Sequence, residues 1–321
     1  MRTCRLTAVW LVAATIWTGC GEPATLADPA ASAPVPANPP PPPMRSQARE
    51  SNAPKDDIRA ASAPAPASSP LPPMRIQAKE FNASEADIRA VCASAASQLW
   101  AHVGDAKVEP LLIVRGHQGP IALYQRNKQG EIVIRLDTGN TFWCQYAYQF
   151  AHEFCHVLTG LRPVDRRYMW LDESLCETAS IFAIRAMARQ WADKPPYPNW
   201  RDFRDSLRSY ADDVIAKHKK VDEVYEKGLP GYVRAHQAEL EKDPCNRSLN
   251  GAIAVVLLRL LEDEPASWES IRYLHAKPPA EGAPFVEYLR NWRQAVPDRH
   301  KAFVGRLARL LGQELDGPPS R

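Results

Sequence analysis

The prolines of this chain are concentrated near one end. Of the 30 prolines in 321 residues, 15 lie between residues 21 and 73, among many alanines and serines. Such a stretch favours extended polyproline conformations and buries too little apolar surface to offset the entropy lost on ordering. We therefore expect residues 20–75 to form a semi-rigid tether and residues 76–321 to form the globular domain.

The first twenty residues predict export. Two arginines precede an apolar run over residues 6–17, and two small residues then lead to Cys20. A cationic start, a short apolar core and small residues after it are typical of a secretory signal peptide, which we assign to residues 1–19. Cys20 resembles the acylated first residue of a bacterial lipoprotein. That resemblance implies a lipid anchor in the membrane and a place in the cell envelope or periplasm, most simply at the outer membrane.

The charge and the apolar content exclude two classes of protein. Lysines and arginines number 40 against 37 acidic residues, a net charge of +3, which is too small to predict a nucleic-acid partner. No apolar run reaches the ~20 residues that a bilayer-spanning helix needs, which excludes a multi-pass membrane protein.

One segment of the tether is duplicated. Residues 44–50 and 57–60 recur, with few changes, as residues 74–80 and 87–90. Only the second copy continues with apolar residues at helical spacing, after Ser84, which can cap a helix. We expect the second copy to form the first helix of the domain and the first copy to be a remnant in the tether, because two copies are too few for a solenoid.

The rest of the chain predicts an α+β fold. Three short runs rich in Ile, Val and Leu predict strands of a small β-sheet, the last two joined as a hairpin. Helical periodicity follows, so that the sheet and the first long helices extend to about residue 192 and a mostly helical C-terminal lobe covers 193–321. The expected strands are 111–115, 121–125 and 131–136, and the expected helices are 142–159, 172–192, 201–218, 249–262, 283–295 and 299–313.

The helix expected over 142–159 carries an HExxH motif, with His152, Glu153 and His156. Residues four apart lie one above the other on a helix, so both imidazoles can bind one metal ion. Two imidazoles leave a tetrahedral zinc ion with room for a third protein ligand and a water, and Glu153 stands beside them where it can reach that water.

The apolar side of this helix points elsewhere. The centre of its apolar stripe lies roughly 200° from the two histidines, so they do not face the core on which the helix packs. This disfavours a pair of ordinary core histidines and predicts that they face a second layer or a cleft. We expect Asn140 or Thr141 to cap the helix start and Gly160 with Pro163 to end it. The stripe consists of Trp143, Tyr146, Ala147, Phe150, Phe154, Val157 and Leu158.

The third ligand separates the known classes of HExxH protein. A third histidine of the HExxHxxGxxH type is absent, because Thr159 and Arg162 occupy the positions of its glycine and histidine. Residues 170–173 instead read Trp-Leu-Asp-Glu. HExxH followed by such a segment resembles the gluzincin metallopeptidases, the superfamily that includes thermolysin and aminopeptidase N. The resemblance implies a zincin-like fold with an active-site helix, one Zn²⁺ bound by His152, His156 and Glu173, and peptide-bond hydrolysis with Glu153 as general base.

The resemblance implies further roles. Glu177 would accept the free ring N–H of a ligand histidine, His152, and fix its orientation. The strand 131–136 would be the edge strand that binds the backbone of a peptide or protein substrate. No motif selects the residue that stabilises the oxyanion, which stays open among Tyr225, Tyr232, His236, Arg247 and Asn250.

Several alternatives stay open. Glu173 and Glu177 could instead be solvated acids in a first helical turn, or a cysteine thiolate could replace Glu173. Cys155 and Cys176 could form a disulfide beside the metal or be small buried thiols, and the sequence does not pair Cys92, Cys144, Cys155, Cys176 and Cys245. A peptidase-like domain that has lost activity would serve as a binding or scaffold module in the envelope, and a tethered peptidoglycan-associated protein is a weaker third hypothesis.

Overall fold

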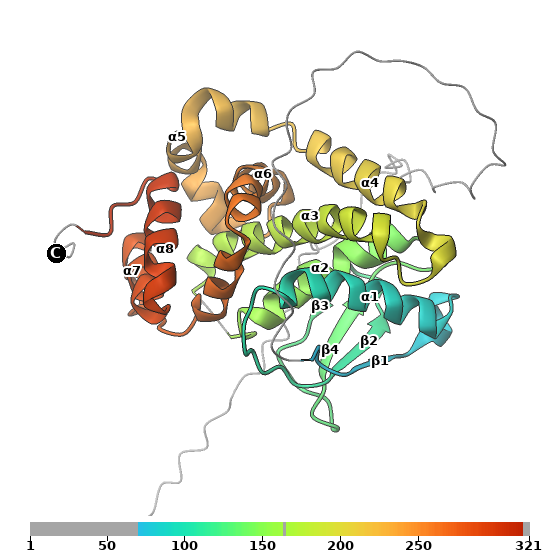
Figure 1. Ribbon diagram of the computed structural model, residues 1–321. Coiled ribbons are helices and arrows are strands. Elements are labelled where there is room, and N and C mark those ends of the chain that lie inside the picture. The colour runs from blue at the N-terminus through green and yellow to red at the C-terminus, as the bar shows by residue number, and fades with distance from the viewer. Residues whose placement is uncertain (1–69, 163–164, 317–321) are drawn as a thin grey trace, which may run out of the picture.

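The computed structural model describes residues 70–162 and 165–316 (Figure 1). The expected signal peptide, Cys20 and the first copy of the repeat lie outside the described residues, as does the expected tether up to residue 69. Within the described ranges, none of the helices combines the length and the apolarity that crossing a membrane requires. The predicted α+β class is confirmed, with one small sheet and many helices.

The sheet of the described part has four strands in the order β1-β2-β4-β3. Strands β1, β2 and β4 are parallel, and β3 runs antiparallel to β4, to which it is joined by the predicted hairpin. The strands are β1 (Met74–Ile76), β2 (Leu111–Arg115), β3 (Ile121–Ala122) and β4 (Ile132–Leu136).

Two expectations about the sheet are wrong. Strand β4, expected at the edge, lies between β2 and β3, so the short antiparallel β3 is the edge strand next to it. The second copy of the repeat does not begin as a helix. Its Met74 and Arg75, which we assigned to the tether, form β1 because their backbone pairs with Leu111 and Leu112 of β2.

One face of the sheet packs against two helices. The register places Leu111 beside Ile132 and Ile113 beside Ile134, and all four side chains are buried. Helices α1 (Glu85–Trp100) and α2 (Trp143–Leu158) contact the strands. Ser84 caps α1 as predicted, since its side chain accepts from the backbone N–H of Asp87. The sheet therefore serves as the support on which α2 lies.

Helix α3 (Met169–Asp193) is the central element of the domain. It contacts α1, α2, α4 and α6, and buried residues occur on all its sides, as expected of a helix inside a domain. In Figure 1 it runs between the sheet with its helices and the C-terminal lobe. The lobe contains α4 (Phe203–Lys217), α5 (Val221–Lys242), α6 (Arg247–Asp263), the 3₁₀ helix Pro265–Tyr273, α7 (Phe285–Ala295) and α8 (Asp298–Leu310).

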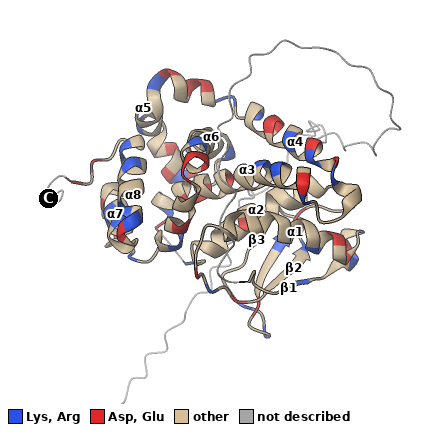
Figure 2. Ribbon diagram, viewed as in Figure 1, with Lys and Arg blue, Asp and Glu red and all other residues tan. Residues whose placement is uncertain are grey.

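Helix α5 was not expected. It is broken at Gly228, whose φ of +68° is left-handed and suits glycine, and Pro230 follows inside the next turn. Figure 2 shows acidic and basic residues interspersed along the outer helices α4 and α5, so these helices present both signs of charge to their surroundings.

An ion pair connects β1 to the hairpin. Arg75 donates to both carboxylate oxygens of Glu131, at 2.8 and 2.5 Å, and Asn127 donates to the same carboxylate at 2.7 Å. Arg75 and Asn127 lower the pKa of Glu131 to about 2. A carboxyl whose folded pKa lies below its usual 4.5 stabilises the fold above that value and ceases to do so as the pH falls toward 2.

We predict that Arg75→Met lowers the melting temperature, with the full deficit above about pH 5 and only a small part of it left near pH 2, because Glu131 then takes up a proton in the unaltered protein as well. Thermal unfolding between pH 2 and pH 7 measures this deficit. Lys301→Met, which removes an exposed pair with Asp298, is the control and should change the melting temperature little. A deficit for Arg75→Met that is constant with pH would contradict the prediction.

Candidate metal centre

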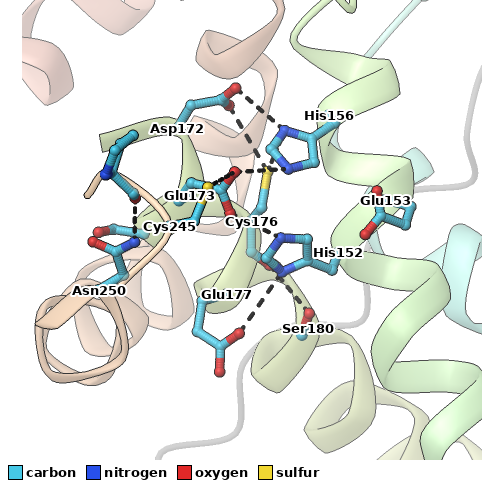
Figure 3. Close-up of polar contacts among 12 residues, drawn as sticks. His152, Glu153, His156, Asp172, Glu173, Cys176, Glu177, Ser180, Cys245 and Asn250 are labelled. Carbon is cyan, nitrogen blue, oxygen red and sulfur yellow. Dashed lines mark hydrogen bonds and ion pairs between the residues drawn. The ribbon is translucent and has the colours of Figure 1, made fainter. Parts of the chain in front are cut away.

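Helix α2 lies on the core as its apolar stripe predicts, since all seven stripe residues are buried. The expected caps at its start are wrong. Phe142 occupies the N-cap without a side-chain hydrogen bond, while Asn140, at φ +50°, accepts from the amide of Asn82 at 2.7 Å. The helix ends at Leu158, and Gly160 follows with a φ of +98°. The two motif histidines face away from the stripe and toward α3 (Figure 3).

The side chains of His152, His156 and Glu173 converge between α2 and α3. The Nε2 atom of His152 lies 3.3 Å from Glu173 Oε2, and Nε2 of His156 lies 3.7 Å from Glu173 Oε1. The two imidazole centroids are 5.1 Å apart. Each side chain is 16–18% exposed, so Glu173 is not a solvated acid in a first turn. Helix α3 in fact begins at Met169, one turn before Glu173.

These three residues fit a zinc ion. Their ligand atoms lie within 4.8 Å of one another. Ligands about 2.0–2.2 Å from a tetrahedral ion stand roughly 3.4 Å apart, close to the 3.3 and 3.7 Å separations between imidazole nitrogen and carboxylate oxygen. The donor set of two imidazoles and one carboxylate leaves the fourth position for water.

The other nitrogen of each histidine faces another carboxylate of α3. His156 Nδ1 lies 3.2 Å from Asp172 Oδ2, and His152 Nδ1 lies 3.7 Å from Glu177 Oε2. The later histidine of α2 thus meets the earlier acid of α3, which shows that the two helices run antiparallel. Glu177 lies where the resemblance implied. Asp172 was not given a role, although its place next to Glu173 in the sequence was a usable signal.

The cluster carries an excess of negative charge. Burial alone would raise the pKa of Glu177, but the rings of His152 and His218 hold it well below its usual range. Burial alone would likewise lower the pKa of His156, but the carboxylates of Asp172 and Glu173 raise it. Three carboxylates around two imidazoles create a negative potential, which favours a divalent cation at the convergence of Nε2 atoms and Glu173.

Glu153 is placed differently from the ligands. It is 3% exposed, and its Oε2 accepts the backbone N–H of Ala122 in β3 at 2.7 Å. Burial raises the pKa of this carboxyl. The general base expected from the motif is therefore held against the edge strand of the sheet.

Two of the cysteines near the cluster are thiols. Cys155 and Cys176 are buried and free, so the structure contains the second of the two alternatives rather than a disulfide between them. Cys176 Sγ lies 3.3 Å from His156 Nδ1, and His156, Asp172 and Cys176 form a second group with metal-ligand spacing. This group uses the nitrogen of His156 that faces Asp172. Cys245 Sγ lies 3.7 Å from Glu173 Oε1.

In the described structure, the expected oxyanion candidates are exposed or contact residues other than His152, His156 and Glu173. Tyr225 is 70% exposed, His236 pairs with Glu223 at 3.0 Å, and Asn250 donates to the carbonyl of Pro244 at 2.6 Å. The ring of Tyr232 is buried beside that of His236, and Arg247 acts on the pKa of Tyr148.

Tyr124, which the sequence analysis did not single out, lies near enough to Asp172 and Glu173 for their charges to act on its phenol. Burial and the charges of Asp172 and Glu173 raise its pKa, although the side chain is 43% exposed. It follows β3 two residues after Ala122, at the bend where the strand ends. An aromatic residue just after the hairpin's first strand was the only signal in the sequence.

We predict that the purified chain binds about one Zn²⁺ and that His152→Gln or His156→Gln lowers the affinity at least a hundredfold, because each removes an imidazole ligand. Competition with a chromogenic chelator measures the affinity. His236→Gln, which removes a paired histidine of α5, should bind zinc like the unaltered chain. Equal affinity in all three variants would contradict the ligand set.

Comparison of the chain with protein-family models, curated proteins and solved structures finds no match. The resemblance to gluzincins therefore rests on the motifs of this chain alone, namely HExxH on α2 and the Asp-Glu pair on α3.

Proposed function

We propose that this protein is a zinc-dependent metallopeptidase of gluzincin type that hydrolyses peptide bonds. The observation that carries the proposal is the convergence of His152, His156 and Glu173, with a buried glutamate, Glu153, on the next residue of the same helix. A structural histidine pair would not require a third carboxylate between the two Nε2 atoms or a glutamate held against a sheet edge.

The reaction follows from the positions of the side chains. When bound, a zinc ion lowers the pKa of a water molecule and polarises a carbonyl group. Glu153 takes the proton from the attacking water and passes it to the leaving amine. Its contact with Ala122 N–H puts this carboxylate beside β3, whose outer edge would align an extended peptide by strand addition. Asp172 and Glu177 keep the Nε2 atoms of the two ligand histidines directed at one point.

Tyr124 is the candidate donor to the oxyanion. Its phenol stays protonated at neutral pH, because burial and the nearby acids raise its pKa. Its partial exposure after β3 allows contact with a substrate lying along the same edge strand. A hydroxyl at this place would supply a hydrogen bond that strengthens as negative charge develops on the carbonyl oxygen.

The remaining parts of the proposal concern location. Residues 1–19 would direct export, Cys20 would carry a lipid, and the proline-rich tether would hold the domain away from the outer membrane. The substrate would then be a peptide or protein of the cell envelope. Export with loss of residues 1–19, measured by mass spectrometry of the mature protein, tests this part separately from the zinc chemistry.

One observation favours a second candidate function. In the described part of the chain, His236 contacts Glu223 and Asn250 contacts the carbonyl of Pro244, rather than a proposed metal ligand. A domain that keeps zinc but lacks an oxyanion donor would be a binding or scaffold module. Zinc content together with cleavage of a quenched peptide library distinguishes the two: the module would bind zinc and cleave nothing.

We predict that Glu153→Gln keeps zinc and lowers the rate of peptide cleavage by about 10²–10⁴-fold, because the amide cannot accept the proton from water. The quenched peptide library measures the rate, and the chelator assay measures the zinc. Glutamine can still receive the Ala122 N–H through its carbonyl oxygen, so the fold should be retained. Undiminished cleavage by this variant would end the assignment of Glu153.

We predict that Tyr124→Phe lowers kcat by about 10–100-fold with zinc affinity unchanged, because it removes one hydrogen bond made chiefly in the transition state. Tyr225→Phe is the matched control, since this tyrosine of α5 is 70% exposed, and its kcat should equal that of the unaltered enzyme. Equal kcat values in both variants would remove Tyr124 from the mechanism.

A further inference from the structure

Two histidines of the C-terminal lobe contact the carboxylates behind the metal ligands. His275, just after the 3₁₀ helix, has Nε2 3.3 Å from Asp172 Oδ2, the oxygen that also faces His156. His218, which follows α4, has Nε2 3.2 Å from Glu177 Oε1, while the other oxygen of Glu177 faces His152. Each proposed ligand histidine thus faces a carboxylate of α3, and that carboxylate in turn faces a histidine of the lobe.

The contact of His275 has a defined direction. His275 is 3% exposed, and its Nδ1 lies 3.1 Å from the hydroxyl of Tyr288 in α7, which is 1% exposed. When the hydroxyl donates to Nδ1, the single proton of the neutral ring lies on Nε2 and points at Asp172. The carboxylate of Asp172 can only accept, so the tautomer with the N–H of Nε2 facing Asp172 and with Nδ1 accepting from Tyr288 suits both neighbours of the ring.

His218 is fixed by a close approach of helix α6. A Cβ atom at Gly251 would overlap the ring of His218, so the absence of a side chain at 251 creates the space that the ring occupies. Glu177 also accepts from the hydroxyl of Tyr148, one turn before His152 on α2. Glu177 thus faces His152, His218 and the hydroxyl of Tyr148. Asp172 faces His156, His275 and the thiol of Cys176.

We propose that His218 and His275 are positioning residues of the metal centre, through which the C-terminal lobe holds the two ligand imidazoles in their binding orientation. The inference rests on the zinc site proposed above. A buried carboxylate that loses a donor turns toward another partner. It then no longer faces the imidazole Nδ1–H, and the imidazole loses its fixed ring orientation.

The experiment measures zinc affinity in the full chain by chelator competition, together with the visible spectrum of the Co²⁺-loaded protein. His275→Leu removes the donor, whereas His275→Gln keeps an amide N–H at similar reach. We expect zinc affinity to fall on the order of tenfold in the leucine variant and to recover largely in the glutamine variant. The Co²⁺ absorption bands should shift in the leucine variant, because the ligand geometry relaxes.

His300 provides the matched control for general loosening of the lobe. It is 3% exposed on α8, and its Nε2 pairs with a buried carboxylate, Glu269, at 2.9 Å. His300→Leu should leave zinc affinity and the Co²⁺ spectrum unchanged. The positioning role is wrong if His300→Leu lowers zinc affinity as much as His275→Leu does. It is also wrong if His275→Gln and His275→Leu lower zinc affinity equally.

Gly251→Ala tests the role of His218 without altering any polar group. The new methyl group should displace the ring of His218 and lower zinc affinity severalfold, although alanine is the better helix former. Gly305→Ala in α8 is the control, because a Cβ there meets only the end of the flexible Arg309 side chain, and zinc affinity should not change. Unchanged affinity in Gly251→Ala would overturn the role of His218.

The same data separate the two proposals. If the unaltered chain binds no zinc, both the proposed peptidase activity and the positioning role are wrong. If the unaltered chain binds zinc tightly and the His275 and Gly251 variants bind it equally well, only the positioning role is overturned. Tyr288→Phe, the mildest change, should lower the affinity less than His275→Leu, and an increase would contradict the tautomer argument.

Discussion

The structure depends on one polar contact in the middle of the domain, where α2 lies against α3. A pair of buried helices usually meets through apolar side chains, but here His152 and His156 of α2 meet three carboxylates of α3, each at most 16% exposed. Buried carboxylates destabilise a fold strongly unless donors or cations compensate them. The pairings of His152 with Glu177 and of His156 with Asp172 also fix the register, because a shift by one helical turn would leave an acid without its imidazole.

The parts of the fold that could be predicted from sequence are those with local causes. The buried stripe and the extent of α2 follow from periodicity within one helix, and the hairpin between β3 and β4 follows from short-range turn signals. Strand β1 was missed because three residues after a proline-rich stretch carry no pattern of their own; they are a strand only because β2 pairs with them. The edge strand was misassigned for a related reason, since sequence order does not tell which hairpin strand enters the sheet.

The candidate site likewise has a part that sequence could predict and a part that it could not. The convergence of His152, His156 and Glu173 could be predicted, because spacings of four residues on α2 and adjacency on α3 are local features that a helix converts into shared faces. The residues behind the ligands could not. His218 and His275 lie 41 and 103 residues after Glu177 and Asp172 respectively, and nothing in the sequence near either histidine indicates the acid that it meets. Helix α5 intervenes between them, and its break at Gly228 hid it from a reading based on uninterrupted periodicity.

The two nitrogens of each motif imidazole face different parts of the domain. The Nε2 atoms face Glu173 and converge where an ion would sit, and residues 152–173 supply the three proposed ligands and the proposed general base. The Nδ1 atoms face carboxylates whose other contacts come from the lobe, as far along the chain as His275. A fragment ending with α3 at Asp193 would contain all three ligands and the general base, yet Asp172 and Glu177 would lose their lobe donors. Both acids would then turn toward water, and the imidazoles would no longer be directed at one point. Under this proposal the lobe is part of the metal centre in an energetic sense, and its helices are needed to make the short motifs on α2 and α3 into a site.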